Sequence, residues 1–253
     1  MKKSLLKVLS VATILALSLG FASCAKKEDA KKQLVMATNA AFPPYEFVEA
    51  NEFAGIDVEI AGAIADKLGM ELVIEDVEFG SIISGVVSGK YDIGMAGMTV
   101  TEERLQSVNF SSTYAIGIQS IIVPEGSPIT SIDELCSGNY TVGTQESTTG
   151  DIYMRDELGD DLVESYKTGA DAVLALTSGK IDAVVIDNQP AIAFVNANEG
   201  LMILDTPFAE EEYAIAVSKD NEELLNDINN ALADLKADGT IDSIIDKYID
   251  SDV

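Results

Sequence analysis

Apolar and polar positions alternate along the chain in a way that predicts strands and helices in turn. Apolar runs without a helical period predict strands at 34–38, 71–77, 93–98, 114–123, 140–144, 201–204 and 213–217, with a small hairpin at 46–48 and 52–53. Apolar residues three and four positions apart predict helices at 55–68, 81–88 and 132–135, and two more within 224–245, divided at Gly239. Alternating strands and helices are typical of the α/β class.

A near-repeat in the sequence predicts two similar lobes. The residues Ser-Gly-Lys-Tyr-Asp at 88–92 recur as Ser-Gly-Lys-Ile-Asp at 178–182. Each copy follows a helix of small and aliphatic residues and precedes an apolar strand, so each marks a helix–strand unit of an α/β lobe. The chain passes outward through 114–123 and returns through 205–217, and two such crossings predict a hinge.

The ends of the predicted strands carry the candidate binding residues. Ligands of open α/β sheets bind beyond the carboxyl ends of strands, and two lobes that face each other there enclose a cleft. The residues at these ends are Asn39, Phe42, Phe79, Gly97, Thr99, Thr148 or Thr149, and Asp187.

Arg104 is the strongest candidate for holding an anion. It follows a predicted N-cap, Thr101, and so falls in the first turn of a helix, where the helix dipole disfavours a cation. A forked donor beside free N–H groups and the Thr99 hydroxyl favours a bound carboxylate. The alternative is a surface salt bridge to Glu102 or Glu103.

The N-terminal residues predict export and lipidation. Residues 1–23 combine a basic start with a short apolar run, as a lipoprotein signal peptide does, and the small residues before Cys24 make this cysteine the expected lipidated N-terminus. Residues 24–33 read as a flexible tether. The alternatives are a plain secretory signal and an uncleaved anchor.

The composition excludes several classes of function. The chain has no histidine, which removes Ser–His and Cys–His nucleophile pairs and histidine metal sites. With Cys24 assigned to lipid, Cys136 is alone, and no disulfide framework is possible. Without the three signal-peptide lysines the chain keeps 13 basic and 43 acidic residues, a formal charge of −30. Such a charge repels nucleic acid, so we expect no nucleic-acid partner.

Four motifs resemble one known family. Residues 55–60 (Gly-Ile-Asp-Val-Glu-Ile), 96–104 with Asn-Phe-Ser at 109–111, 38–46, and 181–187 are similar, in order and at the same spacing, to the bacterial extracellular solute-binding proteins of family 3. These proteins capture substrate for polar amino-acid ABC importers.

The resemblance implies a fold and a setting. It implies a two-lobe periplasmic-binding-protein fold of type II, with mixed sheets flanked by helices and joined by a two-strand hinge. Lobe 1 is expected to comprise 34–117 plus 213–253, and lobe 2 to comprise 118–212. The implied protein is a monomer without metal or cofactor, anchored outside the cell membrane by its lipid alone, that delivers a polar amino acid to the transmembrane permease.

The resemblance also implies a role for each site residue. Arg104, Thr99 and a group near Thr149 would hold the ligand α-carboxylate, while Asp187 and the Gly97 carbonyl would hold the α-ammonium. Phe42 and Phe79 would sandwich the ligand side chain, and Asn39 and Gln145 would touch its head group. Thr148 is the remaining candidate. Taken alone, Phe42 and Phe79 are also typical core residues, and Asp187 and Thr149 typical helix caps.

The ligand itself is an open question at this stage. Asn39 in place of an acid favours a polar neutral amino acid such as glutamine, and basic amino acids follow closely because Glu46, Glu49 or Glu210 supplies a possible counter-charge. Cys136 replaces a common loop lysine, and Ile186 offers the ligand no polar group.

Two other functions compete with transport. A few members of this fold are dehydratases of small cyclic carboxylates, although no carboxylate pair here has a spacing that indicates catalysis. The other alternative is a surface amino-acid sensor or adhesin. We expect a binding protein and no enzyme.

Overall fold

The structure is a computed structural model that describes residues 31–205 and 209–249, and residues from Lys31 onward form one compact unit. The expected signal peptide, the lipidation site Cys24 and most of the tether lie outside the described residues. The last tether residue, Gln33, is already part of the first strand. No helix within the described ranges is both long and apolar enough to cross a membrane.

Lobe 1 is the name used here for a five-stranded mixed sheet and its helices. The strand order is β5-β1-β6-β14-β7. Parallel pairing joins β1 to β5 and β6, and β14 is antiparallel to β6 and β7. The strands are β1 (Gln33–Thr38), β5 (Glu71–Asp76), β6 (Ile93–Gly94), β7 (Val108–Phe110) and β14 (Ala216–Ser218). The helices are α1 (Ile56–Lys67), α2 (Ile82–Val87), α3 (Glu102–Ser107), α8 (Glu222–Ala237) and α9 (Thr240–Tyr248), with a 3-10 turn at Phe79–Ser81. A three-stranded meander adds β2 (Ala41–Phe42), β3 (Glu46–Glu49) and β4 (Glu52–Ala54).

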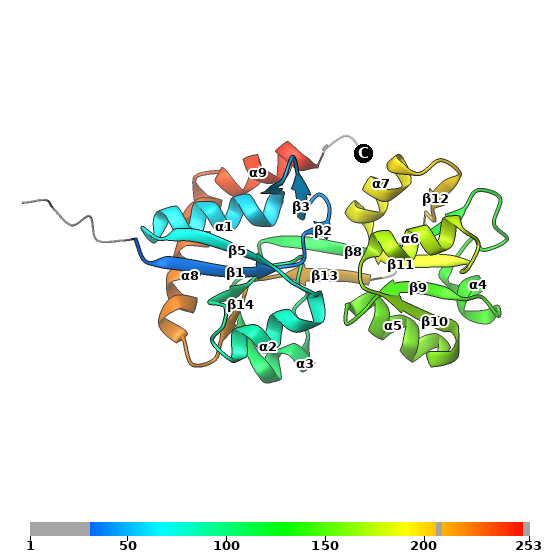
Figure 1. Cartoon of the computed structure of the whole chain (residues 1–253), viewed down its shortest axis with the longest axis horizontal. Helices are drawn as coiled ribbons and strands as arrows, with labels where there is room; N and C mark the ends of the chain where they lie inside the picture. The colour runs from blue at the N-terminus through cyan, green and yellow to red at the C-terminus, as the bar shows by residue number, and fades with distance from the viewer. Residues whose placement is uncertain (1–30, 206–208, 250–253) are drawn as a thin grey trace, which may run out of the picture. The chain divides into compact units, whose positions relative to one another are not determined.

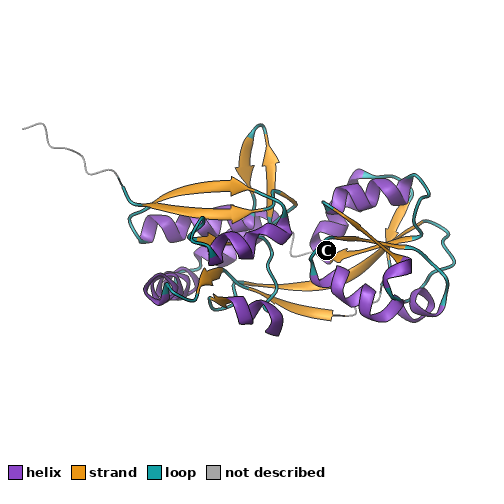
Figure 2. Cartoon of the chain, turned by 60° about the horizontal axis from the view of Figure 1, so that its bottom comes forward, coloured by secondary structure: helices purple, strands orange, loops and turns teal. Residues whose placement is uncertain are grey.

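Lobe 2 is the second sheet with its helices, and Figure 2 shows helices on both sides of this sheet. The strand order is β10-β9-β11-β8-β12, and β13 also pairs with β8. The strands are β8 (Ala115–Pro124), β9 (Val142–Gln145), β10 (Val163–Tyr166), β11 (Ala183–Asp187), β12 (Leu201–Ile203) and β13 (Ala209–Tyr213). The helices are α4 (Ile132–Ser137), α5 (Thr149–Leu158), α6 (Gly169–Thr177) and α7 (Asn188–Ala197), with a 3-10 turn at Asp160–Leu162.

Two neighbouring strands connect the lobes. In Figure 1, β8 and β13 lie side by side, and they pair antiparallel with Tyr213 opposite Ala115. Each continues directly into lobe 1, because β7 precedes β8 and β14 follows β13. The predicted double crossing is therefore present. A lobe boundary between 117 and 118 would fall inside β8.

The sequence near-repeat is a structural repeat. Gly89 and Gly179 both end a helix in the left-handed region, at φ of 72° and 71°. The aspartate that ends each copy links the start of the following strand to the strand beside it in the sheet. Asp92 Oδ2 accepts from the Val35 N–H, and Asp182 Oδ2 accepts from the Thr141 N–H, at 2.8 Å each.

Three details differ from the expectation. The strand predicted at 93–98 ends at Gly94, because the chain leaves the sheet there and turns at Gly97, whose φ is 51°. The strand predicted at 213–217 is divided between β13 and β14, since the chain changes sheets at Ala214. Val87, an apolar residue of the helix predicted at 81–88, is exposed at the last position of α2 and does not join the core.

Helix α1 shows why the sequence folds as it does at the start of lobe 1. Ile56, Ile60 and Ile64 recur every four residues and are fully buried, so one face of the helix closes the core. The helix can begin only after a glycine, because a Cβ at Gly55 would lie 2.2 Å from the main-chain oxygen of Tyr45.

Candidate functional site

One cavity brings together all the predicted binding residues. The space between its walls, including the part open to solvent, is about 320 Å³. Its lining residues are Asn39, Phe42, Glu46, Phe79, Ala96, Gly97, Thr99, Arg104, Gln145, Thr148, Thr149 and Asp187. Ten of these twelve are the sequence-predicted residues, and the two additions are Glu46 and Ala96.

Both lobes contribute to the cavity through the ends of their strands. In lobe 1, Asn39 follows β1 directly, and the segment after β6 supplies Gly97 and Thr99. In lobe 2, Gln145 and Asp187 are the last residues of β9 and β11. This is the placement predicted for open α/β sheets, in which ligands bind beyond the carboxyl ends of strands.

The Arg104 side chain is buried without an anionic partner. The Thr101 hydroxyl caps α3 by accepting from the Arg104 N–H at 3.1 Å, which fixes this residue in the first turn. The guanidinium donates to two main-chain carbonyls, Thr99 at 2.7 Å and Ser147 at 3.1 Å, and its carbon lies 5.2 Å from the Phe79 ring centroid. No acidic oxygen of the described residues lies within 4.0 Å of it, so the expected alternative, a surface salt bridge, is absent there. Burial lowers the pKa of Arg104, which is the electrostatic cost of a cation without a counter-ion.

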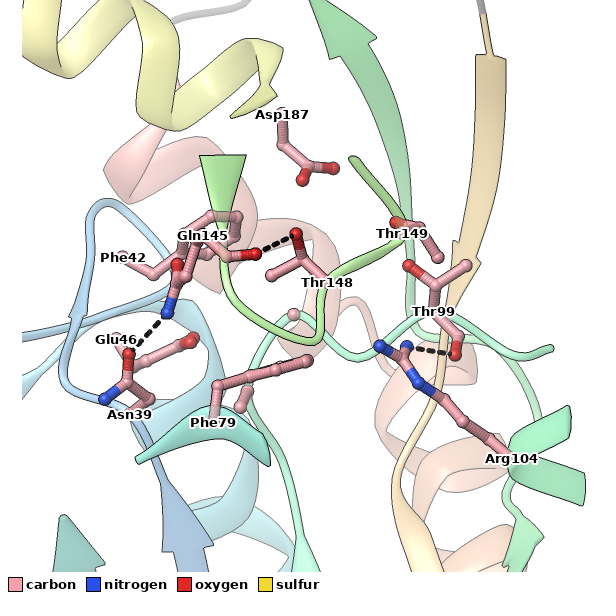
Figure 3. Close-up of a pocket in the computed structure, with 12 residues that line it drawn as sticks. Asn39, Phe42, Glu46, Phe79, Thr99, Arg104, Gln145, Thr148, Thr149 and Asp187 are labelled. Carbon is pink, nitrogen blue, oxygen red and sulfur yellow. Dashed lines mark hydrogen bonds between the residues drawn. The ribbon is translucent and has the colours of Figure 1, made fainter. Parts of the chain in front are cut away.

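Asp187 is the buried anion of the cavity. Its Oδ2 accepts from Gln119 Nε2 at 2.9 Å, and its Oδ1 accepts from the Tyr213 hydroxyl. Burial, followed by the nearby Glu211 carboxylate, raises the pKa of Asp187 to about 7, although the two hydrogen bonds oppose the rise. A cationic group in the cavity would relieve this cost. Figure 3 shows Asp187 and Arg104 on opposite sides of Thr99 and Thr149.

Glu211 and Gln119 form a hydrogen-bonded support behind the cavity that the sequence analysis missed. Gln119 Nε2 bridges the two acids, since it also donates to Glu211 Oε2 at 3.1 Å. The Thr99 hydroxyl donates to the same Glu211 oxygen at 3.1 Å. Gln119 is a polar residue inside the apolar run of β8, and this interruption is the sequence feature that could have identified it as functional. Glu211 has no such feature, because its neighbours Glu210 and Glu212 are acidic too.

Glu46 is the second acid of the cavity wall, after Asp187. It is 1% exposed and lies beside Asp57, which is fully buried at the start of α1. Burial and then the Asp57 charge raise the pKa of Glu46 well above its usual range. Of the three glutamates expected to supply a possible counter-charge, Glu46 lines the cavity, whereas Glu49 and Glu210 do not.

The remaining polar groups define the opposite end of the cavity. Gln145 Nε2 donates to Asn39 Oδ1 at 2.9 Å, while Asn39 Nδ2 donates to the Val77 carbonyl at 2.8 Å. Phe42 is a cavity wall whose ring stacks on Tyr45, with 5.9 Å between centroids. Its buried side chain therefore serves the core and the cavity at once.

Two helix caps differ from the alternatives weighed from the sequence. The cap of α5 is Thr148, whose hydroxyl accepts from the Asp151 N–H at 3.3 Å, and Thr149 is the first helical residue. Asp187 occupies the N-cap position of α7, but its side chain makes no capping hydrogen bond. Its carboxylate is therefore engaged with Gln119 and Tyr213 and not with the helix.

Several contacts between described residues join the lobes around the cavity, in addition to the Thr99–Glu211 hydrogen bond described above. Besides the Asn39–Gln145 and Arg104–Ser147 hydrogen bonds, Lys167 of lobe 2 pairs with Glu78 of lobe 1. The structure thus describes the lobes in contact over the site. In the described ranges, no group of three acidic or cysteine residues is arranged to hold a metal ion.

A cation, an anion and apolar walls enclose this small space. That set matches a zwitterion, because a carboxylate can pair with Arg104 while an ammonium group pairs with Asp187. The N-terminus of α5 adds main-chain N–H groups at Thr149, beside the arginine.

Comparisons with known proteins agree with this geometry. The family model of bacterial extracellular solute-binding proteins, family 3, matches residues 34–251. The arginine-binding extracellular protein ArtP of Bacillus subtilis is 32% identical over 258 residues, covering 98% of both chains. An ancestral arginine-binding protein bound to glutamine is 38% identical with a TM-score of 0.82, covering 87% of this chain and 98% of that one.

A further solved structure bears on the enzyme alternative. The ancestral amino acid-binding protein AncCDT-1, a precursor of cyclohexadienyl dehydratase, is 31% identical with a TM-score of 0.80, over 85% of this chain and 95% of that one. The fold neighbours are type II periplasmic binding proteins, and the mixed α/β sheets flanked by helices agree with them. The chain belongs to family 3 of the bacterial extracellular solute-binding proteins.

Proposed function

We propose that this protein is the extracytoplasmic substrate-binding component of an amino-acid ABC importer, and that its cavity captures a polar α-amino acid. The observation that carries the proposal is the buried guanidinium of Arg104, which has only neutral carbonyl acceptors and faces the same small space as Asp187. A buried cation of this kind is stabilised when a ligand carboxylate enters.

Each cavity residue then has a role in holding the amino acid. Arg104, Thr99 and the main chain at Thr149 bind the α-carboxylate. Asp187 and the Gly97 carbonyl bind the α-ammonium. Phe42 and Phe79 lie against the ligand side chain, Asn39 and Gln145 meet its head group, and Thr148 closes the wall beside them.

The charge of the site favours arginine over glutamine. Asp187 and Glu46 line the cavity, Glu211 and Asp57 stand directly behind it, and Arg104 is the lining cation. A zwitterion with a neutral side chain leaves this excess of acids unchanged, whereas a cationic side chain offsets one of them. We therefore propose that both ligands bind, arginine more tightly. The arginine-binding relative and the glutamine-bound ancestral protein support binding of both ligands, and the preference for arginine is proposed from the charge of the site alone.

The setting follows from the sequence. We propose cleavage of residues 1–23, a lipid on Cys24 and a tether to residue 32, which hold a monomer at the outer face of the membrane without a spanning helix. Residues 34–117 with 213–253 and residues 118–212 are proposed to move as two bodies about β8 and β13. The permease would recognise the form closed over ligand.

Thermal denaturation tests the proposal directly. The mature domain from Ala25 onward is unfolded, dialysed free of ligand, refolded and screened against the twenty amino acids. A melting temperature that rises with the concentration of arginine and glutamine is expected. No shift with any amino acid, in a domain that melts cooperatively, would refute the proposal.

Two further assays separate the alternatives. Purified protein incubated with prephenate or arogenate should leave both unchanged, because we propose a binding protein and no enzyme. A strain lacking the protein should lose uptake of labelled arginine at low concentration. Normal uptake in that strain would favour a sensor or an adhesin.

A further inference from the structure

Glu46, which lines the cavity, and Asp57 behind it form a buried pair of acids. One oxygen atom of each has no hydrogen-bond donor within the described ranges. Asp57 Oδ2 accepts from the Gly97 N–H and from the Tyr114 hydroxyl, both at 2.8 Å. The other Asp57 oxygen, Oδ1, and Glu46 Oε2 are both buried and have no donor among the described residues when both groups are ionised. Buried acceptors without a donor are costly and rare in folded proteins.

One proton between the two carboxyl groups would give both of these oxygen atoms a hydrogen-bond partner. The two carboxyl groups are within hydrogen-bond contact, but two carboxylates have no proton to donate. A proton on Glu46 creates an O–H group that donates to Asp57. Asp57 is the member that keeps its charge, because two other donors already stabilise its carboxylate. Burial raises the pKa of Asp57 to about 6, and burial with the Asp57 charge raises that of Glu46 well above its usual value.

The other groups around the pair favour the retained proton. The charged and titratable groups that face it are Asp187, Tyr45 and Tyr114, with Tyr213 packed on Tyr45 and Arg104 across the cavity. Burial and neighbouring acids keep the pKa of each of these tyrosines above its usual value, so they remain neutral. Asp187 adds a second negative charge near Glu46. The empty cavity therefore presents Glu46 as a neutral acid.

We propose that Glu46 and Asp57 share one proton in the ligand-free protein, and that a cationic ligand side chain expels it on binding. The inference rests on the proposed function, and it assigns a specificity role to the pair. The O–H bond of Glu46 breaks, the proton passes to solvent, and the carboxylate left behind pairs with the guanidinium. A neutral side chain such as that of glutamine leaves the proton in place.

Isothermal titration calorimetry of the parent protein tests this without any variant. Arginine and glutamine are titrated at pH 8 in phosphate and in Tris, whose ionisation enthalpies differ strongly. Asp187 is mostly ionised at this pH, so its own proton contributes little. We expect about one proton released per arginine bound and almost none per glutamine. Arginine binding without proton release overturns the inference but leaves the proposed function intact.

Two variants on the same strand sharpen the test. Glu46→Gln keeps a donor to Asp57 and has no proton to lose, so arginine that binds this variant should do so without proton release. Glu49→Gln, at an exposed position of β3, should behave as the parent does. Unchanged release from Glu46→Gln would assign the proton to another group and refute the proposal.

If arginine does not bind, the proposed ligand class is refuted. The shared proton can then still be tested by measuring the stability of the ligand-free protein against pH. A folded protein that retains a proton loses stability as pH rises above the unfolded pKa of glutamate, about 4.3. The denaturant midpoint of the parent should therefore fall between pH 5 and pH 8 by more than that of Glu46→Gln. Equal falls would refute the shared proton itself.

Discussion

The guanidinium of Arg104 reaches across the cavity to the main-chain carbonyl of Ser147, with 3.1 Å between Nη2 and the oxygen. The contact links the two lobes, but its acceptor is neutral, so it gives the guanidinium no ion-pair partner; the acids near Arg104, Glu211 first among them, act on it only at longer range. A ligand carboxylate would supply that ion-pair partner and would gain a donor already fixed in place.

Replacing Arg104 with alanine should therefore weaken binding of arginine and glutamine by similar factors, because both present the same α-carboxylate. Loss of a desolvated charge partner costs about 2–5 kcal/mol, or about 30-fold to 4,000-fold in Kd. Calorimetry with each ligand measures the change.

Arg155 provides the matched control for that experiment. It pairs with Asp151 and Asp160 on α5 and its 3-10 extension and does not line the cavity. Arg155→Lys should leave both affinities within a few fold of the parent. Full binding by Arg104→Ala would show that the carboxylate lies elsewhere.

Affinity for glutamine should rise with pH until Asp187 is ionised. The pKa of Asp187 is raised to about 7, so below that pH the ligand ammonium must displace a proton. The association constant should fall by up to about tenfold for each pH unit between 7 and 5. Titrations at constant ionic strength measure this, and Asp187→Asn, although a weak binder, should show no such slope.

Asp187 should also make the stability of the ligand-free protein depend on pH. In the ligand-free protein Asp187 keeps a proton that the unfolded chain releases above about pH 4. Its contribution to the free energy of unfolding is therefore lost as pH rises from about 4 to about 7. Saturating glutamine should flatten that decline.

The sequence predicted the positions of the site residues better than their connections. Strand ends, glycine turns and the helix cap at Thr101 are local signals, so residues such as Gly97 and Arg104 were identifiable one at a time. The Gln119 bridge between Asp187 and Glu211 joins strands separated along the chain, and no local pattern encodes that pairing.

Strand length was predicted least well for a related reason. The apolar run at 93–98 has the composition of a buried strand, but only Ile93–Gly94 pairs with neighbouring strands. The rest is buried because lobe 1 and the cavity wall enclose it. Burial by a ligand site and burial inside a sheet leave the same hydrophobic signature, and only the fold separates them.

A methyl group at Gly97 should impair binding by crowding the cavity. A Cβ there would lie 2.9 Å from Cε1 of Phe42, a cavity wall, and φ at this position is 51°. Gly97→Ala should therefore weaken glutamine and arginine binding by at least about tenfold and lower the melting temperature as well.

Gly89→Ala separates strain from crowding. Gly89 has a comparable φ of 72°, but a Cβ there meets nothing within 4 Å, and the residue lies at the end of α2, away from the cavity. This variant should lower the melting temperature by a similar backbone strain and keep parental affinity. Equal affinity losses in both variants would show that the effect is global.

The exposed ion pair between Lys167 and Glu78 should slow ligand release, because it forms only while the lobes are in contact. Lys167→Ala should raise the dissociation rate by no more than about fivefold, the range for exposed pairs, and high salt should remove the difference. The control is Lys247→Ala, which breaks a partly exposed pair with Glu59 inside lobe 1. Stopped-flow displacement of bound ligand measures both rates. If the two variants release ligand equally fast, the Lys167 pair does not stabilise closure.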